Sequence, residues 1–282
     1  MKTANPTSPS GDKTVPLSRW QAAAIHLGLS AILYVVLLYL IVFFWYPQPY
    51  FAADGGWEGV RLITGVDLVL GPLLTLIVFK AGKPGLWRDL TLIGVVQTVA
   101  LVWGTWLVYD QRVAMVTYAD GSFYTLTPEQ VRDAGGLAPA VAEGAGTTPP
   151  YGYVRLPANS KERNELRLRT LFTAKPMHQL GDRYEPLDAK NLKEVLKEGV
   201  DLGKYTARLE QNRQALERFL NRHGGKAEDY AFLPLSCRYQ DLFLALRRSD
   251  GIVVDGLQID KRAPAAATPP DGSNTQSPPP VS

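Results

Sequence analysis

The chain has 282 residues, 46% of them hydrophobic and 20% charged, and its 30 basic and 27 acidic residues give a formal charge of +3. This balance excludes a charged disordered polymer and offers no basic footprint for nucleic acid. A single cysteine excludes an intramolecular disulfide framework and a cysteine-rich zinc site. The mean hydropathy of −0.08 averages a very apolar first third and a polar remainder, and this contrast predicts two different environments.

Three apolar segments in the first third are long enough to cross a membrane. Residues 21–46 and 90–109 carry no formally charged side chain, and residues 62–79 carry one acid. A hydrocarbon core needs about 20 helical residues, and aromatic side chains gather at the segment ends, where headgroups favour them. A cleaved signal peptide is disfavoured, because the first run is too long and no small-residue cleavage motif follows it. We expect three transmembrane helices, preceded by a disordered cytoplasmic arm at 1–20.

Basic residues near these segments indicate their orientation. The N-terminal arm and the loop at 80–89 carry Lys and Arg, whereas the loop at 47–61 carries only Arg61, beside acids. Basic loops stay in the cytoplasm. We therefore expect an inner-membrane protein of a bacterium, with a cytoplasmic N-terminus and a periplasmic C-terminal domain.

Residues 110–262 predict a small α+β periplasmic domain. β-forming runs flank Asp120-Gly121 and again Ser249-Asp250-Gly251, which is typical of hairpins. Thr127 before Pro-Glu-Gln is a helix-start signal. Further helices are expected at 161–174, 188–199 and 206–223, a loop at 134–150, and a disordered Pro- and Ser-rich tail at 263–282.

The chain lacks the sequence motifs of common hydrolases, nucleotide-binding proteins and zinc peptidases. Its three histidines have no ligand spacing, so neither a metal site nor a cofactor is expected. Cys237 precedes Arg238, which could lower the thiol pKa and make it reactive. A small buried residue at a strand entry and an intermolecular disulfide are the alternatives.

Asp67 is the most informative residue, because an acid within a membrane span is costly and marks a functional candidate. A span that starts at Leu62 would place Asp67 about 7 Å below the outer boundary, within reach of Arg61 or of the third span near Thr105. Gly71 lies one turn further, so both are expected on a face that packs closely on a neighbouring helix. Pro72 is expected to kink the span. Structural and partner-binding roles for Asp67 both stay open.

The loop after the first apolar segment is dense in aromatic residues, prolines and glycines. This density predicts a structured cap on the outer membrane surface. Its candidate residues are Trp45, Pro47, Asp54, Gly55, Gly56 and Trp57.

The motifs WYPQPYF at 45–51, DGGWEGVR at 54–61 and GVDLVLGPLLTLIVFK at 65–80 resemble the membrane part of the type IV pilin accessory proteins, also described as fimbrial assembly proteins. The resemblance runs from about Arg19 to Leu126 and gives no role to Cys237. It implies an inner-membrane accessory factor that stabilises pilin subunits or modulates pilus assembly without catalysis. The implied partners are the type IV major pilin and the lipid bilayer, with no nucleic acid.

Two other classes compete with this hypothesis. A membrane-anchored periplasmic binding or sensory module with a non-pilin partner is the main alternative. A membrane enzyme using Asp67 or Cys237 is disfavoured, because the spans hold no second acid, base or metal cluster. The sequence leaves the oligomeric state open.

Overall fold

The computed structural model describes residues 17–81, 83–137, 139–143, 149–173 and 175–261. The chain divides into two compact units. A helical unit contains the stretches before Pro47 and from Gly55 to Arg112, and a sheet domain contains Gln48–Asp54 together with the chain from Val113 on. The proposed arm at 1–16 and the proposed tail at 263–282 lie outside the described residues.

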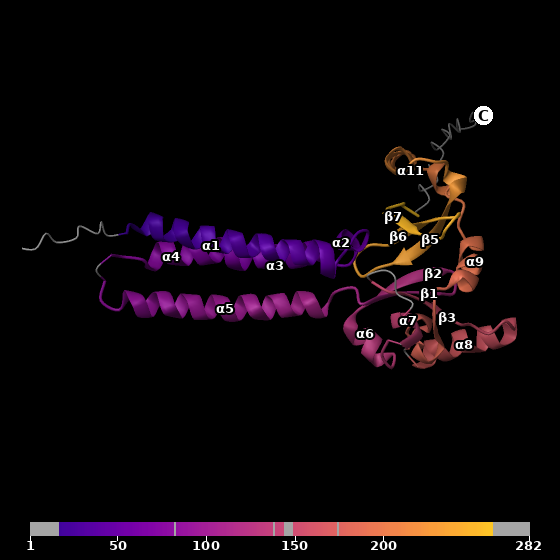
Figure 1. The fold of residues 1–282 in the computed structure, drawn as a ribbon, viewed down its shortest axis with the longest axis horizontal. Coiled ribbons are helices and arrows are strands. Elements are labelled where there is room, and N and C mark those ends of the chain that lie inside the picture. The colour runs from indigo at the N-terminus through magenta and orange to yellow at the C-terminus, as the bar shows by residue number, and fades with distance from the viewer. Residues whose placement is uncertain (1–16, 82, 138, 144–148, 174, 262–282) are drawn as a thin grey trace, which may run out of the picture. The chain divides into compact units, whose positions relative to one another are not determined.

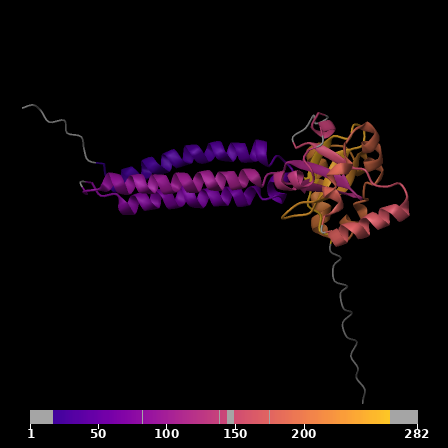
Figure 2. The ribbon, with the colours of Figure 1, turned by 90° about the horizontal axis from the view of Figure 1, so that it is seen from below.

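Three helices of the helical unit are long and apolar enough to cross a membrane, as the sequence predicts: Arg19–Trp45, Gly56–Val78 and Leu86–Asp110. The first consists of α1 (Arg19–Leu40) and the π-helical η1 (Ile41–Trp45). The second consists of α3 (Gly56–Ile63), the π-helical η2 (Thr64–Leu70) and α4 (Gly71–Val78), and the third is α5 (Leu86–Asp110). The three run alongside one another (Figure 1, Figure 2).

All three helix starts differ from the predicted bounds, and the third helix begins at Leu86, four residues before Leu90 (90 − 86). Ser18 caps α1 through a reciprocal capping box with Gln21, so the helix includes Arg19 and Trp20, which had been assigned to the arm. The second helix begins at Gly56, six residues before Leu62 (62 − 56). Gly55 with φ 102° provides the left-handed N-cap there, a conformation that glycine adopts without a Cβ penalty.

The sheet domain contains a seven-stranded mixed sheet in the order β4-β3-β1-β2-β5-β6-β7. The pairs β1–β3 and β2–β5 are parallel, and the other neighbours are antiparallel. The strands are β1 (Met115–Ala119), β2 (Ser122–Leu126), β3 (Tyr151–Val154), β4 (Tyr184–Pro186), β5 (Tyr230–Ser236), β6 (Leu242–Arg247) and β7 (Val253–Leu257).

The sheet domain also contains short helices, which precede the strands or lie between them along the chain. These are α2 (Tyr50–Ala53), α6 (Pro128–Asp133), α7 (Pro139–Glu143), α8 (Ser160–Thr173), α9 (Ala189–Lys197), α10 (Gly203–Thr206) and α11 (Glu210–His223), with 3₁₀ turns η3 (Met177–Gln179), η4 (Gly181–Arg183) and η5 (Ala227–Asp229).

Local signals place most of these elements. Asp120 and Gly121 have φ of 51° and 86° and turn the first hairpin, Thr127 caps α6 through a capping box with Gln130, and β6 and β7 form the second hairpin. The helix predicted at 206–223 is observed as α11, which starts four residues later, at Glu210, and ends at His223 (210 − 206). The loop predicted at 134–150 contains α7.

Two apolar clusters form the core of the sheet domain. One gathers Met115, Leu126, Val131, Val154 and Tyr184, and the other gathers Phe219, Phe232, Phe243, Ala245 and Leu257. Because these side chains come from strands and helices distant in sequence, the domain is held together by long-range packing.

Candidate functional site

Asp67 lies at the middle of the second helix. It is eleven residues from either end of Gly56–Val78 (67 − 56 and 78 − 67), or about 16 Å along the axis. The helix starts at Gly56 rather than at Leu62, so Asp67 lies further from the helix start than the apolar run predicts, and its depth below the membrane boundary stays a prediction. Asp67 is buried, and its Oδ2 atom has no hydrogen-bond partner among the described residues.

Gly71 packs closely on neighbouring helices, as expected. A Cβ at this position would lie 2.0 Å from Gln97 Nε2 on α5 and 3.0 Å from His26 Nε2 on α1. One turn on, the buried Thr75 shares a 2.7 Å hydrogen bond with His26 Nδ1. A larger residue here would have to displace the Gln97 and His26 side chains, at the point where three helices bring polar groups together.

Gln97 extends this polar interior. Its side chain is buried, and within the described part of the chain neither amide atom has a hydrogen-bond partner. Arg61, which the sequence offered as a partner for Asp67, instead pairs with Glu58 at 3.6 Å. The helical unit thus carries a buried polar row, Asp67, Thr75 and Gln97, in which Asp67 and Gln97 have atoms without a hydrogen-bond partner among the described residues.

Pro72 lies where the second helix changes from π-helical to α-helical geometry. The π-helical η2 ends immediately before α4, and Pro72 lies in the first turn of α4. A wider turn gives room for a proline ring that would clash with the carbonyl four residues earlier.

Trp45 and Pro47 mark the end of the first helix. The Trp45 ring packs edge-on against Tyr109 of α5, with centroids 5.2 Å apart. The neighbouring Tyr46 donates a 3.0 Å hydrogen bond from its hydroxyl to the Val108 carbonyl. Pro47 is the last residue of the helical unit before the chain enters the sheet domain.

The segment Gln48–Asp54, here called the inserted segment, belongs to the sheet domain. Tyr50, Phe51 and Ala53 are buried, and the Tyr50 and Tyr151 hydroxyls share a hydrogen bond. The Ala53 carbonyl accepts hydrogen bonds from the amides of Tyr239 (3.0 Å) and Gln240 (3.3 Å). The expected cap therefore divides in two, since these seven residues belong to the domain and Gly55 onward belongs to the second helix.

Asp54 is the polar anchor of this inserted segment. Its Oδ1 accepts hydrogen bonds from the Thr125 hydroxyl (2.9 Å) and the Arg238 amide (3.1 Å), and the Cys237 thiol also bonds to the carboxylate. Its Oδ2 is buried, without a partner among the described residues. Burial raises the pKa of Asp54, and the hydrogen bonds partly oppose that shift.

Cys237 is not an activated thiol. It follows the end of β5 rather than a strand entry, and burial together with the Asp54 carboxylate raises its pKa. Burial also raises the pKa of Tyr50, and of Tyr151 to about 12. These groups act here as hydrogen-bonding partners that hold the inserted segment.

Gly56 and Trp57 start the second helix. Gly56 is buried, whereas the Trp57 side chain is half exposed. Nearby, a Cβ on Gly59 would lie 2.9 Å from the Val108 side chain, so this end of the helix packs closely on α5.

Sequence reasoning gave no role to Gln97, which it placed nearer the inner side than Asp67, and it missed Tyr50, Thr125 and Tyr151. The sequence does contain a signal for Gln97, because it is an amide in a charge-free apolar run. Like Asp67, it costs free energy when its polar atoms find no hydrogen-bond partner in apolar surroundings. The partners of Asp54 had no sequence signal, since Thr125 lies 71 residues away and Arg238 lies 184 residues away.

The fold defines a class of protein in which three helices able to cross a membrane are joined to a mixed-sheet domain. Among the described residues, no group of three or more His, Cys, Asp or Glu side chains could hold a metal ion. No solved structure is significantly similar to the chain.

Residues 17–55 match the family profile described as Fimbrial assembly protein FimB. The chain is 35% identical over 98 residues to three fimbrial assembly proteins of Dichelobacter nodosus, of serogroup E1, serogroups C1 and C2, and serogroup I. The match covers 34% of this chain, and 38%, 75% and 38% of those relatives. The chain belongs to this family of fimbrial assembly proteins.

Proposed function

We propose that this protein is an inner-membrane accessory factor that stabilises type IV pilin subunits or modulates pilus assembly, without catalysis. The observation that carries the proposal is the family match over the first apolar helix and the inserted segment. In this arrangement the N-terminus is cytoplasmic and the sheet domain periplasmic, because the basic side chains Arg19, Lys80, Lys83 and Arg88 lie at one end of the helices.

Two exposed apolar surfaces suit a client that has a membrane helix and a folded head. Along the helices, Gly28, Gly65 and Gly94 have open space around them, which permits close approach of another helix. On the sheet domain, α8 exposes Leu168, Leu171 and Phe172, which share one helix face at i, i+3 and i+4. A contiguous exposed apolar patch on a water-facing domain marks an interaction site.

A non-catalytic role agrees with the chemistry of the buried groups. The Cys237 thiol has a raised pKa, which opposes nucleophilic attack. We expect Cys237→Ser to leave pilus assembly intact, and loss of piliation with a normal protein level would revive the enzyme hypothesis.

The test of the proposal is the amount of pilin in whole cells and in the sheared surface fraction, with and without this gene. A fall in both fractions, restored by complementation, would indicate protection of the subunit. A normal cellular pool with depleted surface pili would indicate action on assembly. No change in either fraction would contradict the proposal.

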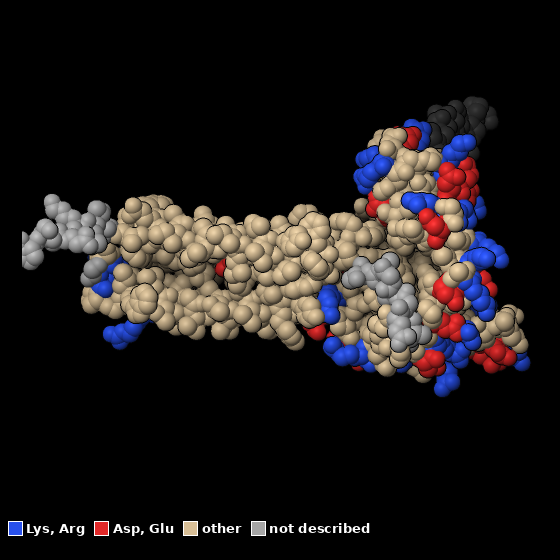
Figure 3. All heavy atoms as spheres, in the orientation of Figure 1, with Lys and Arg blue, Asp and Glu red and all other residues tan. Residues whose placement is uncertain are grey.

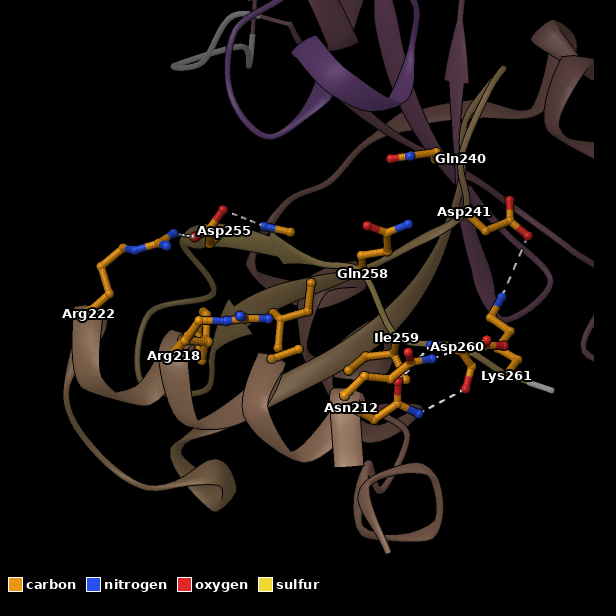
Figure 4. Close-up of a pocket in the computed structure, with 15 residues that line it drawn as sticks. Asn212, Arg218, Arg222, Gln240, Asp241, Asp255, Gln258, Ile259, Asp260 and Lys261 are labelled. Carbon is orange, nitrogen blue, oxygen red and sulfur yellow. Dashed lines mark hydrogen bonds and ion pairs between the residues drawn. The ribbon is translucent and has the colours of Figure 1, made fainter. Parts of the chain in front are cut away.

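A second candidate function is a membrane-anchored binding or sensory module. A hollow of about 740 Å³ lies between α11 and the chain around β7. Figure 4 shows Arg218 and Arg222 on its helix side, with Gln240 and Gln258 opposite. Arg222 pairs with Asp255 at 3.0 Å, whereas Arg218 has no partner among the described residues.

The lining also includes Asp241, which pairs with Lys261, and Asp255 and Asp260, so a hydroxylated small molecule with an anionic group that reaches Arg218 suits the hollow. A thermal-shift screen of the full chain against such compounds, with Arg218→Gln as the comparison variant, tests this function. Stabilisation that disappears in the variant, together with normal piliation in the deletion strain, would favour the binding module.

A further inference from the structure

We propose that the helical unit binds an anionic phospholipid at the end of the bundle where α1 begins. The acyl chain would lie in an apolar hollow, and the phosphate would lie among basic side chains at its mouth. The proposal rests on the membrane location given under the proposed function.

The hollow has a volume of about 570 Å³, within the range of about 300–1,000 Å³ for small-molecule sites. Its walls come from α1, the end of α4 and the beginning of α5. The apolar wall residues are Leu17, Ala22, Ile25, Leu29, Leu33, Phe79, Trp87, Leu90 and Ile93, with Gly94.

The polar side chains in the wall do not compete for a charged ligand. His26 and Thr75 satisfy each other through their 2.7 Å hydrogen bond. Besides these two side chains and Ser30, the wall is apolar and contains no Asp, Glu, Lys or Arg, so its deeper part suits hydrocarbon.

Basic side chains adjoin the mouth of the hollow in sequence. Arg19 lies in the first turn of α1, Lys80 follows Phe79, and Arg88 follows Trp87. All three are exposed, and none has an ion-pair partner among the described residues. Figure 3 shows blue spheres at this end of the helices and an almost wholly tan surface along them.

The charges at this end are complementary to a phosphate. The only acid in residues 17–33 and 72–94 is Asp89, and it pairs with Lys83 at 2.6 Å. Three unpaired cations therefore remain. Basic pockets between membrane helices on the cytoplasmic side bind anionic headgroups, and the exposed Trp87 ring suits the headgroup level.

The test is to reconstitute the full chain with an equal mixture of phosphatidylglycerol and phosphatidylethanolamine, and to count the lipids retained after detergent extraction by native mass spectrometry. We expect selective retention of phosphatidylglycerol. Arg19→Gln/Arg88→Gln should lower this preference about fivefold for each charge removed. The control Arg61→Gln/Arg169→Gln removes two exposed charges elsewhere and should retain the wild-type preference.

A second pair of variants tests the hollow itself. Gly94 lines the hollow and Gly28 does not, although both have open space around them. Gly94→Leu should lower retention of both lipids, and Gly28→Leu should not. Equal retention of the two lipids by the wild type, or equal effects of the two leucines, would overturn the proposal.

A partner helix in the same hollow would give a different result and would also overturn it. Gly94→Leu would then release a co-purifying membrane protein without changing lipid retention. Failure of the pilin measurement alone would contradict the pilus role and leave the lipid site standing, since lipid counting does not depend on the client.

Discussion

The helical unit and the sheet domain distribute their apolar side chains in opposite ways. In the helical unit, Ile32, Ile77 and Val99 are exposed, while Asp67 and Gln97 are buried. In the sheet domain the buried side chains are mainly Leu, Phe, Val and Tyr, and Asp54 is the one buried charged side chain among its described residues. A domain in water is stabilised by burying apolar area, whereas helices in lipid gain nothing from that and associate through small and polar residues.

The inserted segment belongs to the sheet domain, although the chain on both sides of it belongs to the helical unit. The chain leaves the helical unit after Pro47, contributes a buried stretch to the sheet domain, and returns at Gly55. The two units are consequently joined by three chain connections, after Pro47, after Asp54 and after Arg112. The following predictions test how far the comparison holds.

The largest expected change in unfolding free energy comes from a Leu→Ala substitution, which we compare between the two units. Leu244 on β6 is fully buried, and Leu92 on α5 is 65% exposed. Leu244→Ala should lower the free energy of unfolding of the sheet domain by about 2–5 kcal/mol, because it leaves a cavity. Leu92→Ala should change stability by less than about 0.5 kcal/mol. Hydrogen exchange of strand and helix amides measures both, and equal losses would contradict the contrast.

The next effect tests close packing between helices. Gly71→Leu places a side chain where Gln97 and His26 leave no room and should destabilise the helical unit by about 1–3 kcal/mol. Gly65→Leu, with open space around its Cβ position, is the matched control. The variants are compared by the melting of helical circular dichroism in detergent. Similar melting temperatures would show that the buried polar row does not depend on Gly71.

His178 should make the sheet domain sensitive to acid. Burial lowers its pKa to about 4, below the unfolded value of about 6.5. Between these values the unfolded chain binds more protons, so stability is present above about pH 6.5 and is lost as the pH falls toward 4. The loss should reach about 2 kcal/mol after allowance for partial exposure.

His178→Phe keeps a ring to stack on Tyr124, whose centroid is 4.1 Å away, and removes the titration. Its unfolding free energy should therefore be less dependent on pH in this window. An unchanged pH profile would show that His178 is not the responsible group.

Asp54 should contribute the smallest change of stability with pH, and its contribution should have the opposite sign to that of His178. Burial raises its pKa, so the folded state takes up a proton at a pH where the unfolded state remains ionised. The ionised carboxylate therefore costs stability near neutral pH, and this cost disappears as the pH falls through the raised pKa. The measurement is best made in the His178→Phe background.

In that background, Asp54→Asn should remove the part of the pH dependence that Asp54 contributes and change stability at pH 7 by about 1 kcal/mol or less. Asp54→Ala should cost about 1–3 kcal/mol, because it leaves the Thr125 hydroxyl and the Arg238 amide without an acceptor. Equal effects of Asn and Ala would contradict the anchoring role of Asp54.

Local rules predicted a large part of the fold. Length and composition found the three long helices, because a membrane span is defined by a count of apolar residues. The hairpin at Asp120-Gly121 and the helix start at Thr127 followed from turn and capping chemistry. The short strand β4, Tyr184–Pro186, is paired only with β3, and three residues carry no period that a sequence can show.

The candidate site was predicted unevenly for the same reason. Asp67 and Gly71 stood out, because an acid and a close-packing glycine are unusual within an apolar helix. The position of Asp67 along its helix differs from the expected one, because the helix continues through residues 56–61, a polar stretch that composition assigned to the loop. Asp54 was chosen as a loop residue, but its anchoring role depends on Thr125 and Arg238.

The sequence by itself determined the contrast between an apolar first third and a polar remainder, the three long helices and the family, since these depend on composition, on spacing along the chain and on shared motifs. Only the tertiary structure decided that Gln48–Asp54 belongs to the sheet domain and that Gln97 and His26 meet Gly71. Those facts depend on contacts between residues far apart in the chain, and the free energy of such contacts comes from packing and hydrogen bonds that no local pattern encodes.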